Sequence, residues 1–201
     1  MHTLSKNNFL PTLLPIMVFI FLNCSKENNP ITNYSNDDII PLAVGNFWKY
    51  HYTLHDTVGN IYADFVTSSI IRGDTLIKNI RWYYIDKNDI YFSNLSDGYY
   101  IYDRYSPDSN KTSLVYKYPC NQNDAYSSWR VADRDTLITV PAGEFNCILY
   151  VYRLETREFF DYHDVFIKPG VGVIKTVRYG YVPNHPIFVW TISELTEYSF
   201  R

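Results

Sequence analysis

Residues 47–54 read FWKYHYTL, and this stretch decides the fold class. Large rings alternate with polar side chains, so in an extended strand Trp48, Tyr50 and Tyr52 point to one face and the polar residues to the other. Aromatic side chains favour the half-buried surface of a pleated sheet. The stretch therefore predicts a β-strand with one face in a protein core.

Short runs of aromatic and β-branched residues continue to residue 198, separated by turn signals. Val140-Pro141-Ala142-Gly143 is one such turn, because proline fixes φ and glycine permits a positive φ. Asp133-Arg134-Asp135 separates a run at 129–132 from another at 136–140. No segment carries the apolar stripe of an amphipathic helix over three turns. We therefore expect an all-β domain, an antiparallel meander that forms a curved sheet, half-barrel or barrel, or packs as a sandwich.

The composition is that of one globular domain and excludes some partners. The chain has 201 residues, of which 46% are hydrophobic, 18% aromatic and 19% charged. The formal net charge is −3. We expect no nucleic-acid partner, because no strong positive field exists to hold phosphates.

The N-terminus predicts export. The apolar run from Phe9 to Leu22 is shorter than the ~20 residues that a spanning helix needs, and it fits the core of a signal peptide. It ends in Phe21-Leu22-Asn23-Cys24, which resembles the bacterial lipobox, so Cys24 is the expected lipidation site. The alternatives are a non-lipidated signal peptide with a chance cysteine, and an uncleaved membrane anchor.

These signals divide the chain into three parts: a lipoprotein signal peptide at 1–23, a flexible polar tether at 24–40 and a single β domain at 41–201. The lipid anchor makes the membrane the first partner. We expect attachment to the bacterial cell envelope, at the outer membrane, and the sequence leaves open whether the domain faces the periplasm or the surface.

Three motifs rich in proline and glycine carry a resemblance. Residues 41–48 read PLAVGNFW, residues 140–147 VPAGEFNC and residues 169–175 PGVGVIK. Together they resemble a family of exported, β-rich lipoproteins common in Bacteroidota and their relatives, over residues 41–198. The resemblance implies a β-rich fold akin to the curved sheets of periplasmic lipoprotein carriers. It implies no catalytic residues, since that family has no established activity. From the residues alone, all three motifs are structural turns.

Two groups of residues are candidates for chemistry. His51 and His55 have a zinc-chelating spacing on a helix, but on a strand their side chains lie about 13 Å apart, so we expect no metal site there. Asp161, His163 and Asp164 form the densest acid–imidazole cluster. Alternation places Asp161 and His163 on one strand face about 6.6 Å apart. We interpret the cluster as a polar outer face, with a ligand or base site as the alternative.

Catalytic and cofactor motifs are missing from the sequence. It contains no Gly-x-Ser-x-Gly, His-Glu-x-x-His, calcium-loop or nucleotide-loop pattern, so we expect no cofactor, no metal and no catalytic residues. Paired carboxylates of a glycosidase cannot be recognised before the fold is known.

Aromatic clusters at 81–84 (RWYY) and 99–102 (YYIY) place rings on both faces of a strand. One face must enter the core; the other either meets solvent or contacts a sugar or a protein. Cys120 and Cys147 either pair as a disulfide or remain separate thiols. The leading hypothesis is thus a non-enzymatic binding or structural lipoprotein; glycan binding or lipid carriage in a defined pocket comes second, and a hydrolase third.

Overall fold

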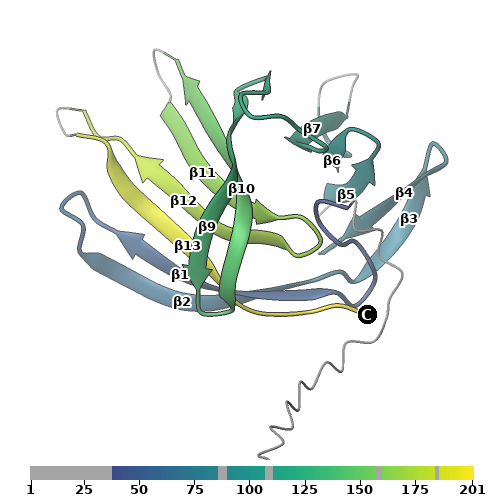
Figure 1. The fold of residues 1–201 in the computed structure, drawn as a ribbon, viewed down its shortest axis with the longest axis horizontal. Coiled ribbons are helices and arrows are strands. Elements are labelled where there is room, and N and C mark those ends of the chain that lie inside the picture. The colour runs from purple at the N-terminus through teal and green to yellow at the C-terminus, as the bar shows by residue number, and fades with distance from the viewer. Residues whose placement is uncertain (1–37, 86–89, 107–110, 157–159, 184–185) are drawn as a thin grey trace, which may run out of the picture. The chain divides into compact units, whose positions relative to one another are not determined.

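The computed structural model describes residues 38–85, 90–106, 111–156, 160–183 and 186–201. Every regular element in these residues is a β-strand, so the predicted all-β class is confirmed (Figure 1). No helix among them is long and apolar enough to cross a membrane. The signal peptide at 1–23, Cys24 and the tether as far as residue 37 lie outside the described residues.

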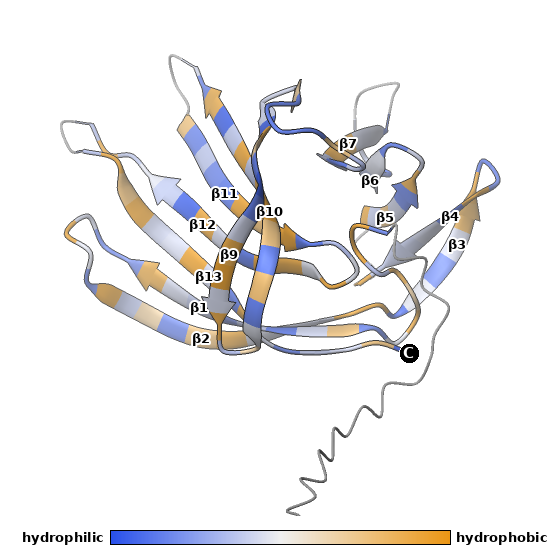
Figure 2. Cartoon of the chain, in the orientation of Figure 1, coloured by the Kyte–Doolittle hydropathy of each residue, from blue (hydrophilic) through white to orange (hydrophobic). Residues whose placement is uncertain are grey.

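Eight strands form the larger sheet, in the order β2-β1-β13-β12-β11-β10-β9-β8, with all neighbours antiparallel. Their bounds are β1 (Phe47–His55), β2 (Ile61–Ile70), β8 (Ala125–Tyr126), β9 (Trp129–Val140), β10 (Gly143–Glu155), β11 (Phe160–Lys168), β12 (Gly172–Gly180) and β13 (Phe188–Ser199). Hydrophobic and hydrophilic residues alternate along several of these strands (Figure 2), as expected for a sheet with one face in the core.

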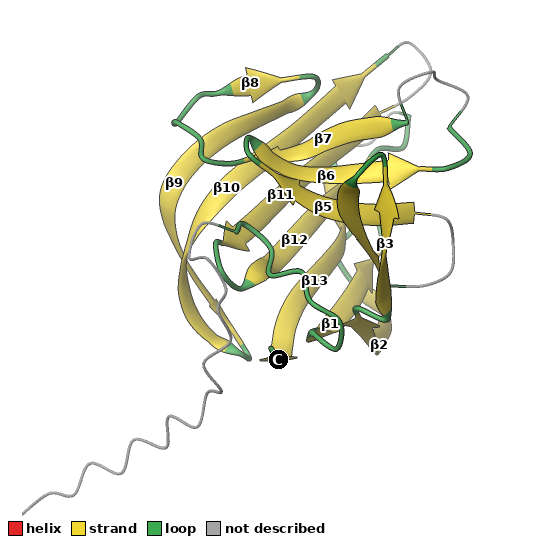
Figure 3. Ribbon diagram, turned by 90° about the vertical axis from the view of Figure 1, so that its right-hand side faces the viewer, coloured by secondary structure: helices red, strands yellow, loops and turns green. Residues whose placement is uncertain are grey.

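Five consecutive strands form the smaller sheet, which is inserted in the chain between β2 and β8. They are β3 (Gly73–Ile77), β4 (Ile80–Tyr84), β5 (Ile90–Leu95), β6 (Gly98–Asp103) and β7 (Thr112–Lys117). The larger sheet is curved and the smaller one lies against one side of it (Figure 3). Strands follow one another as a meander except that β13 pairs with β1. The antiparallel meander with a curved sheet is therefore as predicted.

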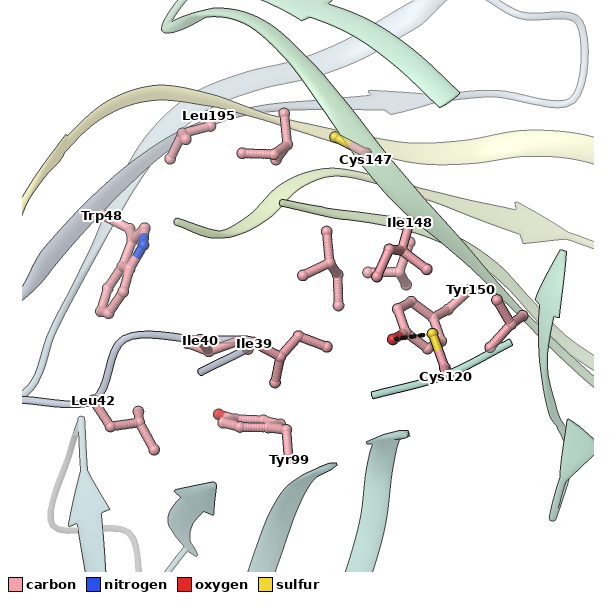
Figure 4. Close-up of a cluster of buried hydrophobic side chains, with 14 of the residues drawn as sticks. Ile39, Ile40, Leu42, Trp48, Tyr99, Cys120, Cys147, Ile148, Tyr150 and Leu195 are labelled. Atoms are coloured by element: carbon pink, nitrogen blue, oxygen red, sulfur yellow. Dashed lines mark hydrogen bonds between the residues drawn. The ribbon is translucent and has the colours of Figure 1, made fainter. Parts of the chain in front are cut away.

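The core lies between the two sheets and draws side chains from both. Trp48 on β1 is 4% exposed, and the rings of Tyr116 on β7 and Tyr150 on β10 lie 5.3 Å apart between centroids. The face of β1 that was predicted to be buried is thus the core face. Figure 4 shows Ile39 and Ile40 in this cluster; both precede the expected start of the domain at residue 41, yet both are buried.

Tyrosine hydroxyls join the two sheets at β7, an edge strand of the smaller sheet. The Lys117 amide donates to the Tyr126 hydroxyl at 3.1 Å, and this hydroxyl donates to the Val115 carbonyl at 3.0 Å. The Tyr150 hydroxyl donates to the Lys117 carbonyl at 2.7 Å. Backbone groups at the edge are therefore satisfied by phenols of the larger sheet, which protects them from a foreign strand.

The proline- and glycine-rich motifs form turns and corners, as their residues predict. Gly143, at φ +135°, opens β10 directly after the Pro141-Ala142 turn. Gly172, at φ +105°, lies against Trp48, whose indole N–H donates to the Val171 carbonyl at 2.7 Å. The motif at 41–48 therefore packs against the motif at 169–175.

The segment Asp133-Arg134-Asp135 is not the predicted turn. β9 runs unbroken from Trp129 to Val140, with register shifts opposite β10 in this region. The Asp133 carboxylate accepts hydrogen bonds from the amides of residues 134 and 135 at 2.7 and 3.4 Å. Hydrogen bonds from an aspartate to the next two amides are typical of turns, but here they stabilise a β-bulge.

Candidate functional site

A pocket of about 1050 Å³ opens where four strands of the larger sheet end. Glu155 is the last residue of β10, Phe160 the first of β11, Gly180 the last of β12 and Phe188 the first of β13, and all four line it. We call it the strand-end pocket. It combines aromatic rings with charged groups, a mixture that is common in ligand pockets.

Two residues of the acid–imidazole cluster, which the sequence analysis interpreted as a polar outer face, lie at this pocket or beside it. Asp161 and His163 share a face of β11, as alternation predicted, and Asp161 Oδ1 lies 2.5 Å from His163 Nε2. Arg178 of β12 stands directly opposite His163 in the ladder. Its Nε–H donates to His163 Nε2 at 3.1 Å, and its Nη2 lies 3.5 Å from Asp161 Oδ1. The three side chains form one polar cluster, of which Asp161 and Arg178 line the pocket.

The protonation of His163 decides which neighbour it binds. Arg178 Nε is always a donor, so Nε2 accepts from it only through a lone pair; donation from Nε2 to Asp161 requires a proton there. Burial, and next the Arg178 guanidinium, lower the pKa of His163 below 6.5 and outweigh the raising effect of Asp161. At neutral pH the imidazole is therefore uncharged.

Asp164, the third member of the predicted cluster, lies on the opposite face of the sheet. Its carboxylate accepts from Arg153 Nη2 at 2.5 Å and from the Tyr179 hydroxyl at 2.7 Å. The Arg153 guanidinium lies 5.0 Å from the Tyr162 ring centroid and 5.7 Å from that of Tyr179. Burial, followed by the hydrogen bond to Asp164, raises the pKa of Tyr179 to about 12. The contacts of Arg153, Asp164 and Tyr179 link β10, β11 and β12. Asp164 is therefore not part of the Asp161–His163 cluster.

Trp190 is a pocket residue that the sequence did not single out. Arg178 pairs with Thr191 and Tyr179 with Val189, so Trp190 falls in a bulge between them. A bulge re-aims a side chain, and the Trp190 indole lies 5.6 Å from the Arg178 guanidinium while its N–H donates to the Tyr62 hydroxyl at 3.3 Å. The side chain is 41% exposed. No signal in the sequence marks this bulge.

The two histidines of β1 have separate partners. His51 Nε2 lies 2.6 Å from Asp64 Oδ1, whereas His55 Nε2 lies 3.0 Å from Thr53 Oγ1. In the part of the chain that the structure describes, no three His, Cys, Asp or Glu side chains are placed to hold a metal ion. His185 lies outside it.

Cys120 and Cys147 are separate buried thiols. Cys120 Sγ lies 3.6 Å from the Tyr150 hydroxyl, and Cys147 Sγ lies 3.6 Å from the Phe145 carbonyl oxygen. Burial raises the pKa of Cys147 to about 11, which keeps the thiol protonated and inert.

The aromatic clusters of the smaller sheet divide between its two faces. Tyr99 of β6 enters the core and is 7% exposed. On the other face, Trp82 is only 2% exposed and its ring centroid lies 5.6 Å from that of Tyr102. Both line a small cavity of about 240 Å³. A ring as buried as Trp82 has little surface left for a sugar, so the accessible tryptophan lies at the strand-end pocket.

No protein-family model and no curated protein sequence matches the chain. Two solved structures are similar. One is a candidate lipoprotein from Parabacteroides distasonis, with 16% identity over 83% of this chain and 100% of that one, and a TM-score of 0.44. The other is a candidate exported protein with a YmcC-like fold from Bacteroides fragilis, with 12% identity over 80% of this chain and 98% of that one, and a TM-score of 0.47.

Proposed function

We propose that the chain is a lipoprotein of the bacterial cell envelope, anchored through Cys24, whose β domain binds a ligand in the strand-end pocket without transforming it. The composition of the pocket carries this proposal: an exposed indole beside Arg178 and Asp161, in a space of about 1050 Å³. Ligand pockets typically measure about 300–1,000 Å³ and pair apolar walls with a few polar groups. The outer membrane is the expected site of the anchor.

Binding fits the pocket better than hydrolysis does. A glycosidase needs one carboxyl group that holds a proton and a second that attacks or activates water. Among the described residues of the lining, both carboxylates are engaged as acceptors: Asp161 faces His163 and Arg178, and Glu155 accepts from the Tyr162 hydroxyl at 3.0 Å. Such contacts hold the carboxylates in place as binding groups.

A lipid carrier is a weaker candidate for this pocket. Acyl chains need a wall of apolar groups, because a charged side chain buried against hydrocarbon loses its hydration without gaining a partner. Glu155, Asp161 and Arg178 all line the strand-end pocket. They favour a ligand that itself carries hydrogen-bonding groups.

Photo-crosslinking in the native host tests the proposal. A benzophenone amino acid replaces Tyr181, a pocket residue that is 54% exposed, and in a matched strain it replaces Tyr105, which is 74% exposed and follows β6 of the smaller sheet. We expect irradiation to give a ligand adduct from position 181 and none from position 105. Equal adducts at both positions, or no adduct at either, would contradict ligand binding in the strand-end pocket.

A further inference from the structure

The geometry points to a neutral oligosaccharide as the ligand of the strand-end pocket: one sugar ring stacks on Trp190, and its hydroxyl groups bond to Arg178 and Asp161. This inference rests on the proposed function and names the ligand class for the same site. It follows from four features of the lining, which concern the rings, the polar groups, the charge and the size.

The rings supply stacking surfaces. Trp190 is the one exposed tryptophan among the four of the chain, all of which are described. Phe160 and Tyr181 form a further wall, with ring centroids 5.6 Å apart. Planar aromatic faces pack against the C–H face of a sugar ring and leave its hydroxyl groups directed outward.

Gly180 keeps one wall of the pocket in place. A Cβ added at this residue would lie 2.6 Å from Cζ of Phe188, whose ring covers the glycine. Both residues line the pocket. The ring of Phe188 can lie here because Gly180, the last residue of β12, has no side chain. The wall is a product of this local sequence.

The polar groups of the pocket place hydrogen-bond donors next to acceptors, as adjacent sugar hydroxyls require. Arg178 uses Nε for His163 and one Nη for Asp161, and a guanidinium carries five N–H donors in a planar fork. The Asp161 carboxylate offers two acceptor oxygens close to that fork. Donors and acceptors side by side suit adjacent sugar hydroxyls, each of which donates and accepts.

The charge favours a neutral sugar over an acidic one. Two carboxylates, Glu155 and Asp161, face one guanidinium, Arg178, among the described residues of the lining. A phosphate or uronate would meet net negative charge and be repelled. A volume of about 1050 Å³ lies just above the ~300–1,000 Å³ that is usual for a pocket holding a drug-sized ligand, so several linked sugars fit better than one.

The test uses the full-length lipoprotein in a detergent without a sugar headgroup, such as dodecyl dimethylamine oxide. The probes are hexasaccharides of glucose, mannose, galactose and xylose, an oligogalacturonate of equal length, and the neutral polysaccharide fraction of the host envelope. Binding is read by calorimetry and by protection of Trp190 fluorescence from acrylamide. We expect at least one neutral probe to bind and to shield the indole.

Matched variants locate the binding. Trp190→Ala and Asp161→Asn should each weaken the neutral probe by about tenfold, the size of a lost stacking contact or charge-assisted hydrogen bond. Trp190→Phe should recover part of the loss. Tyr105→Ala, in the turn that follows β6 of the smaller sheet, should bind as the wild type does. Circular dichroism confirms that each variant is folded.

The outcomes separate the ligand class from the proposed function. Tighter binding of oligogalacturonate than of any neutral probe would overturn the inference, and so would an absence of binding by every neutral probe. In either case an adduct at position 181 in the host would leave the proposed function standing. Loss of the adduct and of all sugar binding would remove both.

Discussion

Tyr150→Phe should lower the free energy of unfolding by about 2 kcal/mol. The side chain is 0% exposed and its hydroxyl donates to the Lys117 carbonyl at 2.7 Å. The substitution keeps the ring and removes only the donor, so the carbonyl of β7 loses its partner at the junction of the sheets. An unsatisfied buried acceptor costs about 1–3 kcal/mol.

Urea denaturation followed by tryptophan fluorescence measures this loss. With a urea m-value of about 2 kcal/mol/M, the midpoint should fall by about 1 M while m stays constant. Tyr100→Phe is the matched control, because its hydroxyl donates at 2.9 Å to Asp97 in an exposed position. Exposed changes of this kind stay within about 0.5 kcal/mol. If the two variants lost the same stability, the hydrogen bond from Tyr150 to β7 would not stabilise the contact between the sheets.

Three further predictions follow from the anchor, the histidine and the thiols. Cys24→Ser should move the protein from the membrane to the soluble fraction, and a mass spectrum of native protein should show acylation at Cys24; an unmodified, soluble native form would refute lipidation. Because the pKa of His163 is lowered in the fold, the unfolded chain takes up that proton first, so the free energy of unfolding should be highest above pH 6.5 and fall as the pH drops below it. His163→Gln should flatten this part of the urea midpoint profile, and an unchanged profile would count against the assignment. Cys120 and Cys147 are both buried, so in the native protein at pH 8 they should react with a thiol reagent far more slowly than in urea; fast labelling would show that the cores around them open.

The strand pattern was predictable wherever alternation and turn chemistry agreed. Residues 47–54 placed Trp48 on the core face because a strand has a period of two, and the turn before Gly143 follows from its positive φ. The segment 133–135 was predicted to be a turn, because an aspartate that accepts from the next amides is typical of turns. The Asp133 carboxylate makes the same contacts here within a β-bulge.

The candidate site was predictable only within one strand. Alternation placed Asp161 beside His163, since both belong to β11. Arg178 and Trp190 come from β12 and β13, and their positions depend on cross-strand register. Bulges shift that register, between Phe166 and Ile167 on β11 and beside Arg178 on β12. A side-chain pattern within one segment carries no information about the register of its neighbour.

The pairing of β13 with β1 has a consequence for the order of events during biogenesis. β1 begins at Phe47 and its partner ends at Ser199, so the ladder between β1 and β13 cannot form until nearly the whole chain is available. Ladders of such high contact order form slowly, because a long loop must close before its contacts stabilise it. The sequence predicts export, and a ladder that forms late leaves β1 unpaired with β13 during translocation. We therefore expect the ladder between β1 and β13 to close only after β13 has crossed the membrane.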